Sequence, residues 1–187
     1  MSVLEIHVLG SPILREVTTP VAQVTDDVRR LIDDMFETMY AAGGVGIAAP
    51  QVGRTERITV IDVGDGPIAL VNPEIVSIGG GRQRAEEGCL SIPELYGDVE
   101  RAAQVSVRAL DAAGEPFELT GTELLARCLQ HEIDHLHGKL FIDYLSILKR
   151  RSAMSRWDKL KKDFPGNRRT VSAQEVAEHG SRHDEEL

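Results

Sequence analysis

The chain has 187 residues, of which 42% are hydrophobic, so it is long enough to bury one substantial core. Its 30 acidic residues exceed its 21 basic residues and give a formal net charge of -9, which argues against a nucleic-acid-binding face over the whole protein because phosphate contacts require basic side chains. The sequence shows no apolar run of the ~20 residues that a membrane span needs, no signal-peptide pattern and too few cysteines for a disulfide framework, and it therefore predicts a cytoplasmic protein.

Hydrophobic periodicity and capping residues predict three helices. The first covers residues 25–42, and Thr25 can cap it. Its apolar stripe consists of Val28, Ile32, Met35 and Met39. The second covers residues 122–137, with Thr122 as the expected cap and Gly138 where a glycine often ends a helix. The third covers residues 147–162 and ends before a Pro-Gly pair.

Between the first two helices the chain is rich in β-forming residues. We predict strands at residues 58–63, 68–71, 73–78, 105–110 and 116–119. Because the strands cluster rather than alternate with helices, the predicted fold class is α+β, a single domain of mostly antiparallel sheets packed around the second helix, plus a C-terminal helix. The domain is predicted to cover residues 1–165, and the polar residues 166–187 are predicted to form a flexible tail.

The second helix carries the sequence Gln-His-Glu-Ile-Asp-His at residues 130–135, which contains H-E-x-x-H. On a helix, His131 and His135 lie on one face, so both imidazoles can reach one metal ion. Glu132 follows the first of them and can approach a water from the side as a general base. A surface helix with coincidental histidines is the weaker alternative, because the helix is delimited by a cap and a glycine.

Two histidines do not complete a catalytic metal site, which usually has three protein ligands and one open position. No glutamate occurs between Glu132 and Glu175, so a thermolysin-like third ligand is missing. Cys89, in the segment Glu-Gly-Cys-Leu-Ser at residues 87–91, offers a thiolate that binds zinc or ferrous iron well. The alternative is a small buried apolar residue, and Gly88 favours the ligand because a glycine lets the backbone approach an ion or substrate closely.

Residues 44–51, Gly-Val-Gly-Ile-Ala-Ala-Pro-Gln, superficially match the dinucleotide-binding pattern G-x-G-x-x-A. The context does not fit, since a helix precedes the glycines and Pro50 and Gly53 leave no room for a crossover helix. Two interpretations remain: a glycine-rich wall that lines a cleft and presents the Gln51 side-chain amide, or a plain tight turn.

The glycine-rich segment, the cysteine segment and the H-E-x-x-H segment together resemble the three signature motifs of the peptide deformylase family, in the same order and at compatible spacing. The similarity extends over residues 4–165. The resemblance implies an amide hydrolase that removes the formyl group from the N-formylmethionine of nascent polypeptides and releases formate. It also implies one metal ion held by Cys89, His131 and His135 with a water as the fourth ligand. The implied native metal is Fe²⁺, which Zn²⁺, Ni²⁺ or Co²⁺ can replace.

Chemistry and resemblance together predict the roles of the other site residues. Glu132 takes a proton from the metal's water and returns it to the leaving amine. The oxyanion is held by the metal, the Gln51 side-chain amide and the Leu90 backbone N–H. Asp134 either orients an imidazole or faces solvent.

The methionine side chain needs an apolar pocket. The residues predicted to line it are Gly44, Val45, Gly46, Ile47, Leu124 and Cys128. Two positions depart from the family pattern: Tyr96 lies where a basic residue can meet the peptide, and Arg127 lies where an aliphatic residue can occur. These departures concern substrate contacts beyond methionine rather than the catalytic centre.

Two other functions remain open. A closed structural zinc site could form from Cys89, Cys128, His131 and His135, because Cys128 lies on the same helical face as the histidines. That alternative leaves Glu132 and Gln51 without a role. The other alternative is a deacylase that acts on another small N-acyl group, which motifs around the metal do not distinguish.

The third predicted helix is basic in an otherwise acidic chain. Its basic residues are Lys149, Arg150, Arg151, Arg156, Lys159, Lys161 and Lys162, and its apolar stripe is Met154, Trp157 and Leu160. Such a run is usually a solvated helix face. Because the implied substrate is a nascent chain, we also consider contact with ribosomal RNA through this helix, without sequence-specific recognition. No membrane partner is expected.

Overall fold

The computed structural model describes residues 2–172 and 174–178. Within this part of the chain, the structure is α+β, as predicted, with a five-stranded antiparallel sheet of order β2-β3-β4-β5-β6 and a two-stranded sheet of β1 and β7. The strands are β1 (Ile6–His7), β2 (Gly46–Ala48), β3 (Ile58–Ile61), β4 (Ile68–Cys89), β5 (Ile92–Leu110), β6 (Pro116–Thr122) and β7 (Arg168–Arg169). The helices are α1 (Asp26–Ala41), α2 (Glu123–Leu136) and α3 (Ile147–Leu160), with short 3-10 helices that include Ala49–Val52 and Phe141–Tyr144.

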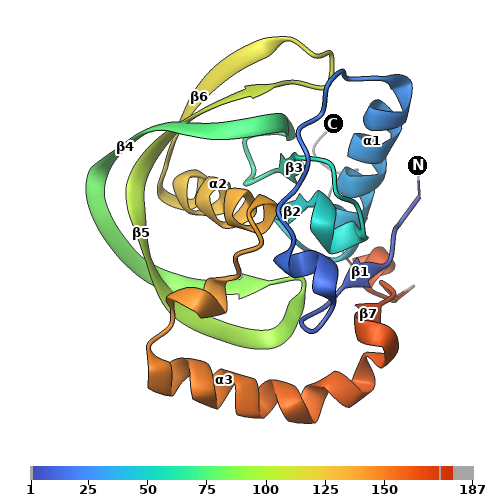
Figure 1. Ribbon diagram of the computed structural model, residues 1–187, viewed down its shortest axis with the longest axis vertical. Helices are drawn as coiled ribbons and strands as arrows, with labels where there is room; N and C mark the ends of the chain where they lie inside the picture. Colours follow the sequence, from blue (N-terminus) through green and yellow to red (C-terminus); the bar gives the residue numbers. More distant parts are fainter. Residues whose placement is uncertain (1, 173, 179–187) are drawn as a thin grey trace.

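The helix α2 lies inside the curve that β4 and β5 form, with β2 and β3 on its other side (Figure 1). Its buried face includes Ala126, Leu129, Ile133 and Leu136, which bind it to the sheet through apolar contacts. Thr122 precedes the helix as predicted, but its side chain makes no capping hydrogen bond. The other end is as predicted: Gly138 has a φ of +70°, and Lys139 N–H donates to the Asp134 carbonyl oxygen (2.9 Å).

The helices α1 and α3 begin and end within two residues of their predicted bounds. On α1, Thr25 Oγ1 accepts a hydrogen bond from Val28 N–H (3.4 Å), and Ile32, Met35 and Met39 are buried. On α3, Trp157 is buried and packs against the 3-10 helix Phe141–Tyr144 and the loops near it, as the predicted apolar stripe requires. This helix lies along the outside of the molecule, away from α2 (Figure 1).

The strands β4 and β5 are much longer than predicted. Short runs at 68–71, 73–78 and 105–110 are parts of two continuous strands that pair from Val71 with Leu110 to Cys89 with Ile92. The middle of β4 is exposed, so no apolar alternation signals it in the sequence. Register shifts, one of them spanning Gly79 to Arg82, let the pair bend around α2. We call this long hairpin the arm.

The C-terminal segment is ordered further than predicted. Within the predicted tail 166–187, Arg168 and Arg169 form β7, which pairs with β1, and the Val171 side chain is 6% exposed and joins the core under α1. The predicted tail therefore starts too early, because two backbone pairs and one apolar side chain fix its first residues. Residues 179–187 lie outside the described part of the chain.

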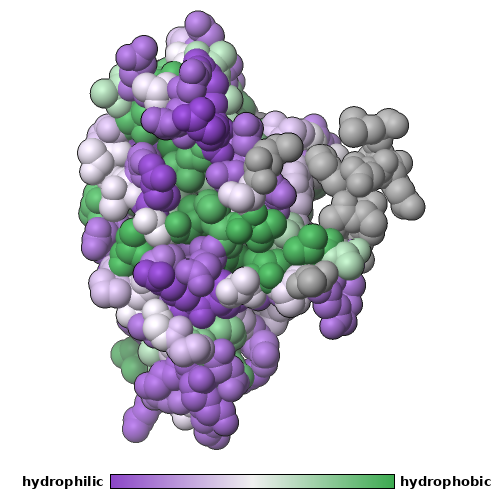
Figure 2. Space-filling view, turned by 90° about the vertical axis from the view of Figure 1, so that its right-hand side faces the viewer, coloured by the Kyte–Doolittle hydropathy of each residue, from purple (hydrophilic) through white to green (hydrophobic). Residues whose placement is uncertain are grey.

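None of the helices within residues 2–172 and 174–178 could span a membrane. On the face that lies to the right in Figure 1, apolar residues form a band across the middle, with strongly hydrophilic residues above and below it (Figure 2).

The glycine after α2 gives a test of the packing at this point. We expect Gly138→Ala to lower the free energy of unfolding by about 2 to 4 kcal/mol, because the methyl group would meet the Arg15 carbonyl oxygen at 2.5 Å in a left-handed backbone conformation. Gly166→Ala is the matched control, since Gly166 has nearly the same φ, +69°, and nothing within 4 Å of an added Cβ. It should cost only about 1 kcal/mol. Urea denaturation measures both, and equal losses would contradict the steric argument.

Candidate active site

The arm brings Cys89 to the two histidines of α2. Cys89 is the last residue of β4, and His131 and His135 are one helical turn apart on α2. The possible ligand atoms of all three lie within 4.8 Å of one another, and Cys89 Sγ is 3.3 Å from His135 Nε2. The structure thus brings together the three residues predicted to hold a metal ion.

The chemistry of this cluster fits a divalent transition-metal ion. A thiolate and two imidazoles suit iron, zinc, nickel or cobalt and leave one position open in a tetrahedral site. Burial lowers the pKa of His135, which favours the neutral imidazole that binds metals. Among the described residues, the Glu132 Oε2 atom is buried beside the cluster without a hydrogen-bond partner, and a water bound to such an ion would satisfy this acceptor.

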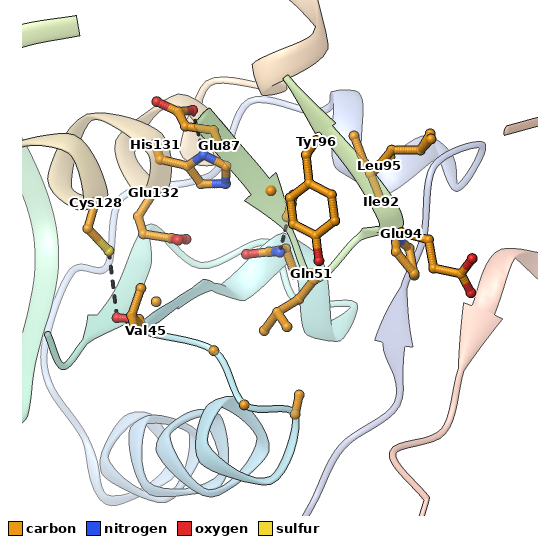
Figure 3. A pocket seen from close by; sticks show the side chains of 18 of the residues that line it. Val45, Gln51, Glu87, Ile92, Glu94, Leu95, Tyr96, Cys128, His131 and Glu132 are labelled. Atoms are coloured by element: carbon orange, nitrogen blue, oxygen red, sulfur yellow. Dashed lines mark hydrogen bonds and ion pairs between the residues drawn. The ribbon is translucent and has the colours of Figure 1, made fainter. Parts of the chain in front are cut away.

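Glu132 points into the pocket between His131 and Gln51 (Figure 3). Its side chain is almost fully buried, and this burial raises its pKa to about 7. A Cβ at Gly46 would lie 2.6 Å from Glu132 Oε1 and 2.8 Å from Cys128 Sγ. Position 46 therefore requires glycine for space, and the glycine-rich segment is a wall of the cavity rather than a plain turn.

Gln51 is held in one orientation. Its Oε1 accepts a hydrogen bond from Ala48 N–H (2.8 Å), and its Nε2 donates to Ser91 Oγ (3.1 Å) and towards Cys89 Sγ (3.5 Å). The amide donor predicted from the sequence thus faces the metal-binding cluster. Leu90 lies beside it on the cavity wall.

A cavity of about 610 Å³ opens next to the cluster. Five of the six predicted pocket residues line it: Gly44, Val45, Gly46, Leu124 and Cys128. Ile47 does not. Successive side chains of a strand point to opposite faces, so Gly46 faces Glu132 while Ile47 is fully buried in the core beside α1. The prediction of Ile47 as a pocket residue was wrong for this reason.

Cys128 is not part of the metal-binding cluster found in the described residues. Its thiol donates to the Val45 carbonyl oxygen (3.6 Å), and burial raises its pKa. Figure 3 shows this contact at the side of the pocket near Glu132. The cluster therefore does not have the fourth ligand that a closed Cys2His2 zinc site needs.

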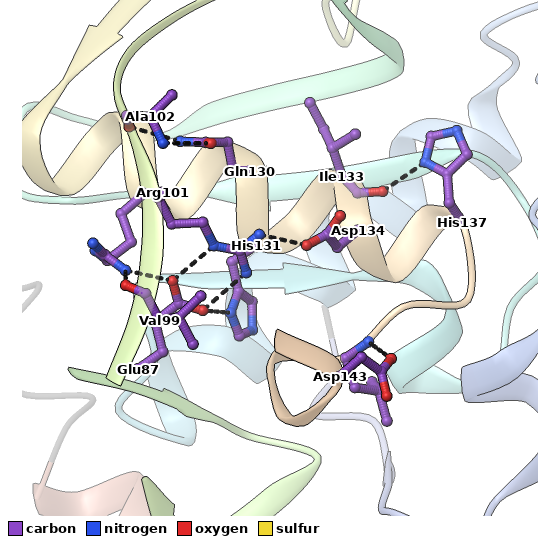
Figure 4. Close-up of polar contacts among 12 residues, drawn as sticks. Glu87, Val99, Arg101, Ala102, Gln130, His131, Ile133, Asp134, His137 and Asp143 are labelled. Atoms are coloured by element: carbon purple, nitrogen blue, oxygen red, sulfur yellow. Dashed lines mark hydrogen bonds and ion pairs between the residues drawn. The ribbon is translucent and has the colours of Figure 1, made fainter. Parts of the chain in front are cut away.

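A buried ion-pair network behind the site was missed in the sequence (Figure 4). Glu87 Oε2 accepts a hydrogen bond from His131 Nδ1 (3.1 Å), and Arg101 pairs with both Glu87 oxygens (2.9 and 3.0 Å). Burial alone would raise the pKa of Glu87, but the hydrogen bonds and charges of His131 and Arg101 lower it to about 2. Glu87 thus orients His131.

Asp134 has neither of its two predicted roles. Its carboxylate accepts a hydrogen bond from Arg101 Nη1 (2.5 Å) and is mostly buried. The orienting role falls to Glu87, which no motif in the sequence singles out. Glu87 and Cys89 are two residues apart, but a register shift lies between them in β4, so strand alternation alone does not place their side chains on one face.

The glycine before Cys89 has a steric role that differs from the predicted one. A Cβ at Gly88 would lie 2.6 Å from the Tyr96 ring, so it is Tyr96 that approaches the backbone here. Tyr96 is 64% exposed and lines the cavity.

The C-terminal segment also reaches the cavity. Phe164, Arg169 and Glu175 line it, and Arg169 Nη1 is 3.2 Å from Glu175 Oε1. This part of the wall is not predicted from the sequence, because the prediction places residues 166–187 in a flexible tail.

Comparisons with known proteins point to one family. The family model described as "Polypeptide deformylase" matches residues 3–151. A protein named "Peptide deformylase" from Alkalilimnicola ehrlichii is 53% identical over 164 residues, which cover 86% of this chain and 92% of that protein. The crystal structure of a peptide deformylase from Legionella pneumophila is 51% identical with a TM-score of 0.82 and covers 86% of this chain and 96% of that one. The structure of the Ehrlichia chaffeensis peptide deformylase in complex with actinonin is 40% identical with a TM-score of 0.83, covering 88% and 99%.

The position of Cys128 predicts which cysteine matters for metal binding. We expect Cys128→Ala to keep about one metal ion per chain and Cys89→Ala to lose most of it, because only Cys89 lies within the cluster. Metal analysis of the purified variants after gel filtration measures this. Metal loss in a Cys128→Ala variant that is still folded by circular dichroism would contradict this prediction and support the closed Cys2His2 zinc site.

Proposed function

This chain belongs to the polypeptide deformylase family, and we propose that it hydrolyses the formyl group of N-formylmethionine at the start of nascent polypeptides and releases formate. The observation that carries the proposal is the buried carboxylate of Glu132. It lies at the side of a metal-binding cluster, faces a cavity and has no hydrogen-bond partner for one oxygen in the described structure.

The metal site is assigned to Cys89, His131 and His135. We propose Fe²⁺ as the native ion, one per chain, with Zn²⁺, Ni²⁺ or Co²⁺ as replacements, because thiolate and imidazole ligands suit all four. When bound, the ion supplies Lewis-acid chemistry: it polarises a carbonyl oxygen and lowers the pKa of a water. Glu87 supports this site by holding the His131 ring through Nδ1.

Glu132 is assigned the proton transfers. It accepts a proton from the attacking water, which adds to the formyl carbon, and it returns that proton to the amine nitrogen as the C–N bond breaks. The products are formate and a free amino terminus. A carboxylate whose pKa burial raises to about 7 can both accept and donate a proton near neutral pH, although a bound cation opposes this rise.

The oxyanion of this reaction needs donors that are already in place. We assign this role to the Gln51 Nε2–H and the Leu90 backbone N–H. The hydrogen bond from Ala48 N–H to Gln51 Oε1 supports the assignment, because it directs the amide nitrogen towards Cys89 and the cluster.

The methionine side chain is assigned to the part of the cavity beside Glu132. Gly44, Gly46, Val45, Leu124 and Cys128 line this part. Val45 and Leu124 are 44% and 52% exposed, so a ligand can cover apolar surface there that water now reaches.

The substrate class places the reaction near translation, so we further propose that the protein acts in the cytoplasm and meets the ribosome through α3. Lys149 and Arg150 pair with Asp98 and Asp143, whereas Lys159 near the end of α3 and Lys162 in the 3-10 helix that follows it are exposed. Exposed cations on one helix can contact RNA phosphates without sequence recognition.

The decisive experiment concerns Glu132. We expect Glu132→Gln to reduce formate release from a formyl-Met-Ala peptide by at least about 100-fold, because the amide cannot accept the proton of the attacking water. The protein is prepared without oxygen and loaded with Fe²⁺ or Ni²⁺. Metal content must equal that of the wild type, so that loss of the base is separated from loss of the ion.

The same assay tests the alternative substrate. An acetyl-Met-Ala peptide is the matched compound, and a deacylase for another small acyl group would release acetate from it faster than formate from the formyl peptide. Well-metallated wild-type protein that releases acetate but no formate would overturn the proposed function.

The ribosome contact has its own test. We expect the reversal Lys159→Glu, Lys161→Glu and Lys162→Glu to reduce co-sedimentation with ribosomes, because attraction to RNA phosphates becomes repulsion. The control is Arg82→Glu, Arg84→Glu and Arg108→Glu on the exposed side of the arm, which changes the net charge equally. Unchanged binding in the first variant, or equal loss in both, would contradict the assignment to α3.

A further inference from the structure

We propose that Arg127 is a positioning residue that sets the distance between Cys89 and the histidines of α2 by tying the arm to the helix. The inference rests on the proposed metal-dependent function and extends it to a residue outside the catalytic motifs. Arg127 lies on α2 one turn before His131, and its side chain is 11% exposed.

The contacts of Arg127 reach both strands of the arm. Its Nη1 donates to Glu87 Oε1 (2.7 Å) and to the Val99 carbonyl oxygen (3.0 Å), and its Nη2 donates to the Gln83 carbonyl oxygen (2.8 Å). Glu87 and Gln83 belong to β4 and Val99 belongs to β5. One planar guanidinium therefore fixes the end of the arm against α2.

The Glu87 carboxylate shows how this contact reaches the metal-binding residues. Arg127 and Arg101 donate to Oε1, while Arg101 and His131 donate to Oε2. The Glu87 carboxylate thus accepts four hydrogen bonds, and each of them helps to fix the position of the Glu87 side chain. Glu87 is two residues before Cys89 on the same strand, so a shift of Glu87 moves both the support of His131 and the backbone of Cys89.

Gln130 and Asp134 of α2 also contact the arm, but neither of them bonds Glu87. Gln130 exchanges hydrogen bonds with Ala102 N–H and carbonyl oxygen (3.1 and 3.0 Å), and Asp134 pairs with Arg101. These contacts add to the attachment of β5 to α2. Among the contacts described, Arg127 is the α2 side chain that bonds Glu87 directly and also reaches the strand backbone.

The test uses Arg127→Met, which keeps an unbranched apolar stem and removes the three donated hydrogen bonds. We expect its dissociation constant for Co²⁺, measured by chelator competition on the full chain, to rise by about 10- to 100-fold. We also expect a shift of the thiolate-to-cobalt absorption band, because the thiolate no longer meets the ion in the same geometry. Both readouts are independent of peptide hydrolysis.

Arg15→Met is the matched control. Arg15 donates hydrogen bonds to Asp143 (2.6 and 3.1 Å) and to the Gly138 carbonyl oxygen (3.2 Å) just after α2, but it does not touch Glu87. It should leave cobalt affinity and spectrum unchanged even where it lowers stability to urea. Equal cobalt affinities and spectra in Arg127→Met and Arg15→Met would overturn the inference and leave Arg127 as a residue that only stabilises the fold.

If Arg127→Met does not fold, Arg127→Lys tests the positioning role of Arg127 instead. An ammonium is a compact donor and does not reproduce the planar span to the three acceptors, so we expect a smaller loss of affinity, about 3- to 10-fold, with a smaller band shift. Wild-type affinity and spectrum in a folded Arg127→Lys would overturn the inference. A wild-type chain that binds cobalt normally but releases no formate would contradict the proposed function alone.

Discussion

The site depends on one buried carboxylate, Glu87, which joins the two parts of the chain that carry the metal-binding side chains. Between Glu74 and Glu86 the β4 strand of the arm is mostly exposed, whereas Ile92, Leu95 and Val99 of β5 are buried in an apolar cluster. The Glu87 carboxylate adds directed bonds from Arg101, Arg127 and His131 to this packing. Removing one partner of such a buried pair leaves a charge without compensation, at a cost of about 3 to 5 kcal/mol. Replacing the whole of such a network by well-packed apolar residues is often neutral for stability, so the network acts as a geometric constraint more than as a source of stability.

A second constraint is the absence of a side chain at position 46. The wall of β2 approaches α2 so closely that a single methyl group would displace the Glu132 carboxylate. Close approach buries the carboxylate, and this burial raises its pKa. The close packing of β2 against α2 thus explains both the glycine at position 46 and the raised pKa of Glu132. The same wall also fixes the Gln51 side-chain amide, because Gln51 Oε1 accepts a hydrogen bond from the backbone N–H of Ala48 in β2.

Local signals allowed much of this structure to be predicted from the sequence. The helices were predicted from their apolar periodicity and from their capping residues. The H-E-x-x-H spacing predicted that two metal-binding histidines lie on one face of a helix. The features that were not predicted depend on contacts between residues far apart in the sequence. The exposed middle of β4 shows no alternation because its strand partner, not the core, holds it. Ile47 was assigned to the wrong side of β2, and Arg101 could not be linked to Glu87 without the pairing of the arm. The part of the cavity wall near Arg169 was not predicted, because Arg169 is held by pairing with β1, which lies at the other end of the sequence.

The pairing of β1 with β7 has a consequence for how the molecule is made. Ile6 lies opposite Arg169, and the neighbouring contact between Glu5 and Arg168 spans 163 residues. At the usual speed of synthesis, the first strand waits roughly 10 to 30 s for its partner. Arg169 and Glu175 line the cavity, so its wall is complete only after residue 175 has been made. The complete cavity therefore forms only after all three metal-binding residues, Cys89, His131 and His135, have been made.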